Sequence, residues 1–324
     1  MQKNKTGIKE FILLGFGEPQ SLHTFLFLIF LLIYIVTLIA NFLTVLLIVT
    51  ARHLHTPMYY FLGNLSCLEI LYSSAILPKT MASFWTGDKA ISLRGCMLQF
   101  YFFSFLVCTE CYLLAVMSYD RFLAICKPLH YARIMDGKLC LSLAGGSWIN
   151  SIVFISIYLP FMLELHYCGS NTIDHFYCES FALIKLSCSH IRILPLVTVI
   201  LAFLFSFPPF LLTLISYVYI IHTILKIPSI TGRQKAFSTC SSHLIVVCLF
   251  YGAIIIVISY YLIPKVEVVR DLSKMFSLLY TVFPPMANPL IYTLRNKDVK
   301  DILRKAAGKI MRNPQFLLQW FLLD

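Results

Sequence analysis

Charged residues are scarce in this sequence. Only 13% of its 324 residues are Asp, Glu, Lys or Arg, whereas 59% are hydrophobic and the mean hydropathy is +0.81. The core of an ordinary soluble domain cannot bury so much apolar surface. The composition therefore argues against a soluble globular protein and predicts a protein that crosses a membrane several times.

Two further features are missing. The first twenty residues contain charges and no apolar h-region, so we expect no cleavable signal peptide and a first membrane helix that acts as the insertion signal. No polar stretch between the apolar segments is longer than about 30 residues, which is shorter than a typical domain. The sequence therefore leaves no room for a separate soluble catalytic or nucleic-acid-binding domain.

Seven stretches with few or no charges are long enough to cross about 30 Å of hydrocarbon. They lie at residues 22–49, 58–77, 97–119, 139–162, 193–225, 236–263 and 275–294. We therefore predict an all-α membrane protein in which residues 22–294 form a bundle of seven transmembrane helices. Residues 1–21 would be an extracellular tail and residues 295–324 a cytoplasmic segment, beginning with a short amphipathic helix because basic and apolar residues alternate there.

The distribution of charge favours this orientation. With residues 1–21 outside, Lys and Arg exceed Asp and Glu much more on the inner side than on the outer side, which is the positive-inside pattern. This pattern accounts for the net charge of +11 without nucleic-acid binding. The sequon at Asn4 then lies outside, where it can be glycosylated.

Three polar side chains interrupt the apolar stretches: Asn41, Glu69 and Glu110. An intramembrane carboxyl group is a functional candidate by default. We expect Glu69 and Glu110 to be neighbours that share a proton or bind a sodium ion, because two close carboxyl groups do not both ionise without a cation. The structural alternative is a pair of neutral, hydrogen-bonded acids, and for Asn41 a hydrogen bond that only supports helix packing.

Helical spacing links Glu110 to both ends of the third stretch. At 100° per residue, Phe103, Glu110 and Arg121 project from one face of that helix. A relay from a ligand to the cytoplasm needs such an arrangement.

Of the 11 cysteines, those on the outer side are Cys96, Cys168, Cys178 and Cys188. Disulfides form under oxidising conditions, and four cysteines allow three connectivities. The remaining cysteines lie in the membrane or on its inner face, where we expect reduced packing residues.

Several motifs together resemble those of odorant (olfactory) receptors of the tetrapod-type class, a branch of the rhodopsin-like G-protein-coupled receptors. They are Pro57-Met58-Tyr59, Met117 to Cys126 with Asp120-Arg121, Ser216-Tyr217, Lys235 to His243, Phe250-Tyr251-Gly252 and Pro285 to Asn296. The motifs occur in the family's order and spacing and cover nearly the whole chain. The chain departs from the usual family pattern at Ala40, Glu69 and Ala287.

The resemblance implies a receptor at the plasma membrane that binds an odorant, activates a stimulatory, olfactory-type G protein and raises cyclic AMP. It favours the disulfides Cys96–Cys178 and Cys168–Cys188. It assigns the G-protein switch to Asp120, Arg121, Tyr217, Asn288, Pro289 and Tyr292. It implies no cofactor and no enzymatic activity.

The ligand is expected to be small, neutral and largely apolar, because the predicted upper halves of helices three, five, six and seven contain no acidic or basic side chain. By helical spacing we expect it to contact Phe103, Ser104, Val107, Cys108, Leu201, Phe205, Tyr251, Ile254, Ile255, Ile258 and Thr281. For each of these the alternative is ordinary packing between helices. Ser104, Tyr251 and Thr281 are the expected hydrogen-bond partners.

Other functions fit the sequence less well. A transporter or channel would be expected to have internal repeats or several polar groups along a path, and neither is visible. An intramembrane enzyme would need a nucleophile with a base or a His-rich metal set, and the nine histidines lie mainly in loops. His243 alone is read as structural. A rhodopsin-like receptor for a non-olfactory small ligand is the nearer alternative.

Overall fold

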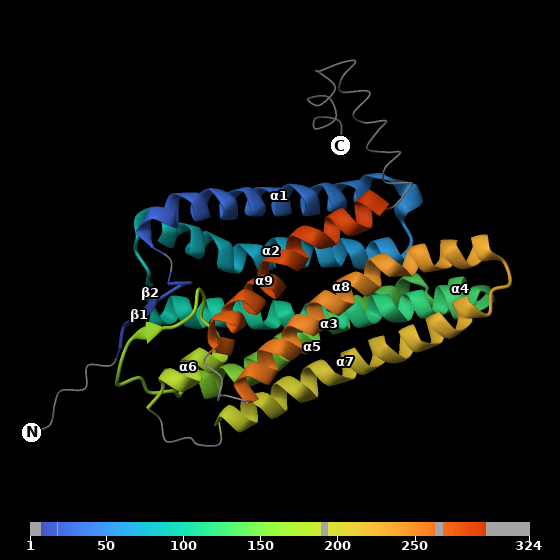
Figure 1. The fold of residues 1–324 in the computed structure, drawn as a ribbon. Helices are drawn as coiled ribbons and strands as arrows, with labels where there is room; N and C mark the ends of the chain where they lie inside the picture. The colour runs from blue at the N-terminus through green and yellow to red at the C-terminus, as the bar shows by residue number, and fades with distance from the viewer. Residues whose placement is uncertain (1–7, 18, 189–193, 263–267, 296–324) are drawn as a thin grey trace, which may run out of the picture.

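The computed structural model describes residues 8–17, 19–188, 194–262 and 268–295. Seven long helices run alongside one another and form a bundle (Figure 1). They are α1 (His23–Thr50), α2 (Pro57–Thr86), α3 (Leu93–Cys126), α5 (Gly137–Leu163), α7 (Leu194–Leu225), α8 (Ile230–Leu262) and α9 (Val268–Arg295). Short helices lie before α1 and between the long helices: η1 (Gln20–Leu22), η2 (Arg52–Leu54), α4 (Pro128–Ile134) and α6 (Ser180–Leu186). The predicted seven-helix bundle is confirmed.

Many apolar side chains of the bundle face outward. Among the described residues, α1, α2, α3, α5 and α7 are long and apolar enough to cross a membrane, and α8 contains a shorter apolar stretch, His243–Ile256. Large side chains such as Phe25, Leu32 and Leu204 are exposed on these helices. Exposed apolar surface on this scale is unfavourable in water but matches the hydrocarbon of a lipid bilayer.

Several helices are longer than the apolar stretches that predict them. α2 continues through Pro78 and Lys79 to Thr86, and α9 begins at Val268, seven residues before the predicted start, so that Lys274 lies within it. The reason is that charge marks where hydrocarbon ends, whereas a helix ends where its backbone hydrogen bonds end. The predicted spans therefore locate the membrane part of each helix and miss the part beyond it.

Helix α3 lies at the centre of the bundle. It packs against α2, α5, α7 and α8 (Figure 1). Its buried side chains include Phe103, Leu106, Leu113 and Met117, which join apolar clusters along much of its length. Residues on α3 are thus placed to contact both ends of the molecule.

A small three-stranded sheet, which the sequence did not predict, covers one end of the bundle. β1 (Glu10–Leu13) pairs antiparallel with β2 (Ala90–Ser92) and parallel with β3 (Thr172–Ile173). Alternate residues of β1, Phe11 and Leu13, are buried against the bundle. We call this end, with β1–β3 and α6, the sheet end, and the opposite end, with η2 and α4, the α4 end (Figure 1).

Candidate functional site

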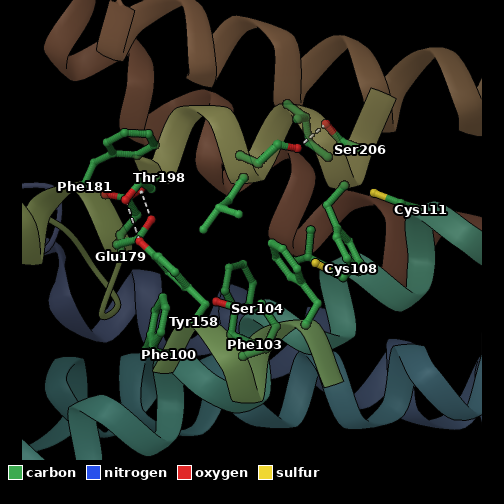
Figure 2. Close-up of a pocket in the computed structure, with 18 of the residues that line it drawn as sticks. Phe100, Phe103, Ser104, Cys108, Cys111, Tyr158, Glu179, Phe181, Thr198 and Ser206 are labelled. Carbon is green, nitrogen blue, oxygen red and sulfur yellow. Dashed lines mark hydrogen bonds between the residues drawn. The ribbon is translucent and has the colours of Figure 1, made fainter. Parts of the chain in front are cut away.

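A cavity of about 190 Å³ lies toward the sheet end, between α3, α5, α6 and α7 (Figure 2). Ile254 of α8 and Tyr280 of α9 complete its wall. Most of its lining is apolar or aromatic, as is usual for a small-molecule site. A cavity of about 150 Å³ already holds benzene. This one, which we call the sheet-end cavity, is therefore large enough for a small organic molecule.

Many of the predicted ligand contacts line the sheet-end cavity. They are Phe103, Ser104, Val107 and Cys108 of α3, Leu201 and Phe205 of α7, and Ile254 of α8. Their common position follows from helical spacing, which turns residues three and four apart toward the same side. The structure thus brings together residues from three helices that are distant in sequence.

Other predicted contacts lie elsewhere. Tyr251 is buried in the α3–α8 interface, where its hydroxyl donates to the Cys111 carbonyl at 3.1 Å. The Thr281 hydroxyl donates to the Leu278 carbonyl of its own helix, and the side chain of Ile255 is half exposed. None of these three lines the sheet-end cavity, so the structure contradicts them as cavity residues. The side chain of Ile258 lies outside the described residues.

The sequence analysis missed one whole side of the cavity. α5 contributes Phe154, Ile155 and Tyr158, and the segment after Cys178 contributes Glu179, Ser180 and Phe181. Missed residues on helices already expected to contribute include Phe100, Thr198 and Ser206. The expected bridge from Cys178 to the start of α3 was a usable signal, because it holds the residues after Cys178 over the bundle.

The polar groups of the cavity gather on one side. The Tyr158 and Thr198 hydroxyls are 2.7 Å apart, and the carboxyl group of Glu179 lies beside them (Figure 2). Glu179 caps α6, since its Oε2 accepts from the Ala182 amide at 2.9 Å. The expectation of a pocket with no acidic side chain considered only the helices, and Glu179 corrects it.

A second polar cluster lies deeper in the bundle. Asn288 of α9 donates to Oε1 of Glu69 on α2 at 2.5 Å, and Asn41 of α1 donates to the Pro285 carbonyl at 2.9 Å. The described hydrogen bond of Glu69 is therefore with Asn288, a partner that the sequence did not reveal. Glu110 is fully buried and interacts electrostatically with Glu69, and neither of its carboxyl oxygens has a hydrogen-bond partner among the described residues.

The α4 end holds three of the predicted switch residues, Asp120, Arg121 and Tyr217, whereas Asn288 belongs to the deeper cluster. Asp120 is fully buried, and its Oδ1 accepts from the Tyr131 hydroxyl of α4 at 2.8 Å. On the other side, the Tyr217 hydroxyl of α7 is 2.6 Å from Nδ1 of His243 on α8. Arg121 lies close enough to His243 to act on it electrostatically. Pro289 is buried in α9, and the side chain of Tyr292 lies outside the described residues.

The sheet end is covalently closed. Disulfides join Cys96 to Cys178 and Cys168 to Cys188, the pairing that the resemblance favours. Lys274 of α9 forms an ion pair with Asp174 and donates to the Gly15 carbonyl at 3.2 Å. These contacts tie the N-terminal segment, the loop after α5 and α9 together.

Next to Asp174 in the chain, His175 is buried, and its ring contacts those of Phe176 and Tyr177. The pKa of His175 is lowered to about 3, chiefly by burial and then by the positive charge of Lys274, while the negative charge of Asp174 opposes the shift. His175 is therefore neutral at physiological pH.

Comparison with known proteins gives consistent matches over almost the whole length. Residues 30–309 match a family model described as Olfactory receptor. The chain is 46% identical to human Olfactory receptor 6B1 over 305 residues, which cover 94% of this chain and 96% of that protein. It is 46% identical to human Olfactory receptor 5B21 over 97% of this chain and 100% of that protein, and 45% identical to mouse Olfactory receptor 6Z7 over 93% and 96%.

Proposed function

The chain belongs to the olfactory receptor family, and from this premise we propose that it binds a small, neutral, largely apolar odorant in the sheet-end cavity and activates a stimulatory, olfactory-type G protein that raises cyclic AMP. Members of this family are multi-pass membrane receptors and not enzymes. The observation that carries the proposal is the apolar cavity, because its volume and lining suit a small organic ligand.

In this proposal the sheet end faces outward at the plasma membrane and the α4 end faces the cytoplasm. The excess of basic residues on the α4 side supports this orientation. Residues 1–21 form the extracellular tail, with a glycosylation site at Asn4, and residues 295–324 form the cytoplasmic amphipathic helix and tail. Asn4 and residues 296–324 lie outside the described residues.

Activation is a shift between two conformations. The odorant binds more tightly when α8 has swung away from α3 at the α4 end, and this opens a cleft beside Arg121 for the G protein. Asp120, Tyr217, Asn288, Pro289 and Tyr292 make up the rest of the switch. A ligand shifts such an equilibrium only by its difference in affinity for the two states, so the cavity and the switch must change together.

The deep polar cluster of Asn41, Glu69 and Glu110 is the hinge region between the two. Oε2 of Glu69, both carboxyl oxygens of Glu110, and the side-chain oxygens of Asn41 and Asn288 have no hydrogen-bond partner among the described residues. An all-oxygen set of this kind suits a hard cation. We propose that a sodium ion or a proton occupies this cluster and that its loss accompanies activation.

The test measures cyclic AMP in cells that co-express the chain, a trafficking helper and an olfactory-type G protein, challenged with a panel of neutral volatiles. We expect a dose-dependent rise. Arg121→Ala should abolish the rise while leaving surface display, measured with an N-terminal tag, unchanged. A full response in Arg121→Ala would contradict the role given to Arg121, and silence of a surface-displayed wild-type chain would contradict the ligand class.

A further inference from the structure

A second cavity opens on the side of the bundle and shares no lining residue with the sheet-end cavity. It lies between the halves of α2 and α3 that are nearer the sheet end, and its volume is about 470 Å³. Three of its lining side chains, Leu71, Leu98 and Phe102, are large, apolar and exposed. In a membrane protein such side chains face the acyl chains of lipid. We call this cavity the α2–α3 groove, and it is open to the membrane.

The groove has a closed inner end. Just beyond it, α5 crosses α2 and α3: the ring of Trp148 lies beside that of Phe105, and its Nε1 donates to Oδ1 of Asn64 at 3.3 Å. From Lys79 to Leu71, the groove follows α2 for about 12 Å. This length gives room for one extended chain of about ten carbons, since about 12 Å separates the two ends.

A positive charge stands at the other end of the groove. Among the described residues that line it, Lys79 of α2 is the only charged one. Its Nζ donates to the Asp88 carbonyl, a neutral acceptor, at 3.5 Å, and it forms no ion pair within the described part of the chain. An ammonium group has three hydrogens to donate. Lys79 therefore has both charge and donors to offer a ligand.

The other polar side chains of the groove are already paired. Nε2 of Gln99 donates to the Ala75 carbonyl at 3.1 Å, and its Oε1 accepts from the Cys178 amide at 3.0 Å. The Ser74 hydroxyl donates to a carbonyl of its own helix at 2.6 Å. Of the described lining side chains, Lys79 is thus the one that can bind the polar group of a ligand.

The depth of Lys79 indicates the kind of anion. α2 continues beyond Lys79 to Thr86, which is about 10 Å farther along the helix, so the ammonium group lies near the edge of the hydrocarbon. A fatty acid carries its carboxylate directly on a single chain. The phosphate of a phospholipid is separated by glycerol from two chains, whereas the groove has room for one.

From this arrangement we infer that the α2–α3 groove binds a fatty acid, with its carboxylate at the Lys79 ammonium and its acyl chain along the apolar wall. This site is separate from that of the odorant. In a bilayer the chain gains little by leaving lipid for the groove, because lipid tails are as apolar as the side chains. Selectivity must therefore come from the charge-assisted hydrogen bond to the carboxylate. The structural alternative is that Lys79 only extends toward the headgroups.

The experiment uses the purified full chain in nanodiscs of phosphatidylcholine, which carry no net charge. The probe is a photoreactive fatty acid of about ten carbons, the length that the groove admits. After irradiation, mass spectrometry of peptides should find the label on the segments of α2 and α3 that contain Leu71 and Phe102. Decanoate should displace the probe at roughly tenfold to hundredfold lower concentration than decanol, as expected for one hydrogen bond between charged groups.

Variants of Lys79 assign this preference to the ammonium group. Lys79→Gln keeps a donor but removes the charge, so the preference for decanoate over decanol should fall roughly tenfold. Lys79→Arg keeps the charge and should retain the preference. Lys138→Gln, at an exposed lysine of α5 at the α4 end, is the control and should leave it unchanged.

A second pair of variants tests the groove itself. Leu98→Trp adds bulk at an exposed side chain of the groove and should abolish labelling of α2 and α3. Leu32→Trp, at an exposed side chain of α1, should be labelled like the wild type. Unchanged thermal midpoints show that each variant is folded.

The outcomes decide the inference without reference to signalling. Equal displacement by decanoate and decanol, or an undiminished preference in Lys79→Gln, would overturn it in favour of a lysine that only extends toward the headgroups. Label confined to other segments would overturn the site. Displacement by phosphatidylglycerol as effective as that by decanoate would overturn the choice of a single-chain ligand. The cyclic AMP response to odorants is measured separately, so each of these failures leaves the proposed function standing.

Discussion

The two ends of the bundle are closed by different kinds of bond. At the sheet end, two disulfides, a three-stranded sheet and the Lys274–Asp174 ion pair join segments far apart in the chain. At the α4 end, the described links between elements are apolar packing and hydrogen bonds, such as Tyr131 to Asp120 and Tyr217 to His243. A covalent link restricts motion far more than a hydrogen bond worth about 1 kcal/mol.

This contrast suggests where a conformational change can occur at low cost. Each hydrogen bond at the α4 end can be exchanged for a bond to water or to a partner protein, whereas the disulfides of the sheet end cannot. We therefore expect that ligand binding at the sheet end causes movement at the α4 end. The predictions below test this comparison by weakening one end or the other.

The largest effect should come from opening the sheet end. Replacing both Cys96 and Cys178 with Ser removes a bridge that spans 82 residues, which should destabilise the fold by about 2–5 kcal/mol. We expect surface display, measured by labelling an N-terminal tag, to be lost. Cys67→Ser, at an exposed free cysteine of α2, is the matched control and should be displayed normally. Normal display without the bridge would show that the sheet end does not depend on it.

The sequence predicted the long helices of the bundle better than the sheet that covers one end, for a physical reason. Helices that cross a membrane are visible in the sequence as long runs without charge. The strands β1, β2 and β3 have four, three and two residues, too few to show a period of two. Their pairing also depends on how the loop after α5 folds back, which no local pattern records.

The cavity was predicted in part for the same reason. Helical spacing found Phe103 and Val107 on one face of α3, and Leu201 on α7. It missed Glu179, whose position depends on the Cys96–Cys178 disulfide and on the N-terminal cap of α6. It also expected Tyr251 in the cavity, whereas the side chain of Tyr251 points toward α3 and does not line the cavity. The partner of Glu69 was missed because Asn288 is 219 residues away.

The next largest effect concerns the deep cluster between the two ends. Asn288→Ala removes the described hydrogen-bond donor to Glu69 and leaves that carboxyl group buried without it, at a cost of about 2 kcal/mol. We expect a lower thermal midpoint for the purified receptor. A double-mutant cycle with Glu69→Leu should give a coupling energy clearly different from zero, and additive effects would contradict a direct interaction.

A smaller effect should follow acidification of the sheet end. The pKa of His175 is about 3 in the folded protein and about 6.5 when unfolded, so between these values the unfolded chain binds the extra proton. Stability from neutral, buried His175 is therefore complete above about pH 6.5 and falls as pH falls toward 3. At about pH 5.5 the loss should be about 1.4 kcal/mol, or one pKa unit.

Thermal midpoints of the purified receptor between about pH 7 and 5.5 measure this loss. His175→Phe, which keeps a ring in contact with Phe176 and Tyr177, should reduce the dependence on pH. His166→Phe, at an exposed histidine of the same loop, should retain the dependence of the wild type. An unchanged slope in His175→Phe would assign the acid sensitivity to another group.

The smallest effect should come from the α4 end, where one hydroxyl group is removed. Tyr217→Phe keeps the ring beside His243 but loses the hydroxyl that links α7 to His243 and, at 3.4 Å, to the Cys240 carbonyl of α8, and the shorter of these bonds is worth about 1 kcal/mol. Because outward movement of α8 would break this bond, its loss should favour the open conformation and raise basal cyclic AMP roughly fivefold. Tyr219→Phe, at an exposed tyrosine of the same helix, is the control and should leave the basal level unchanged. An unchanged or lower basal level in Tyr217→Phe, at equal surface display, would mean that this bond does not hold the α4 end closed. The contacts of Asp120 would then be the ones that hold this end closed.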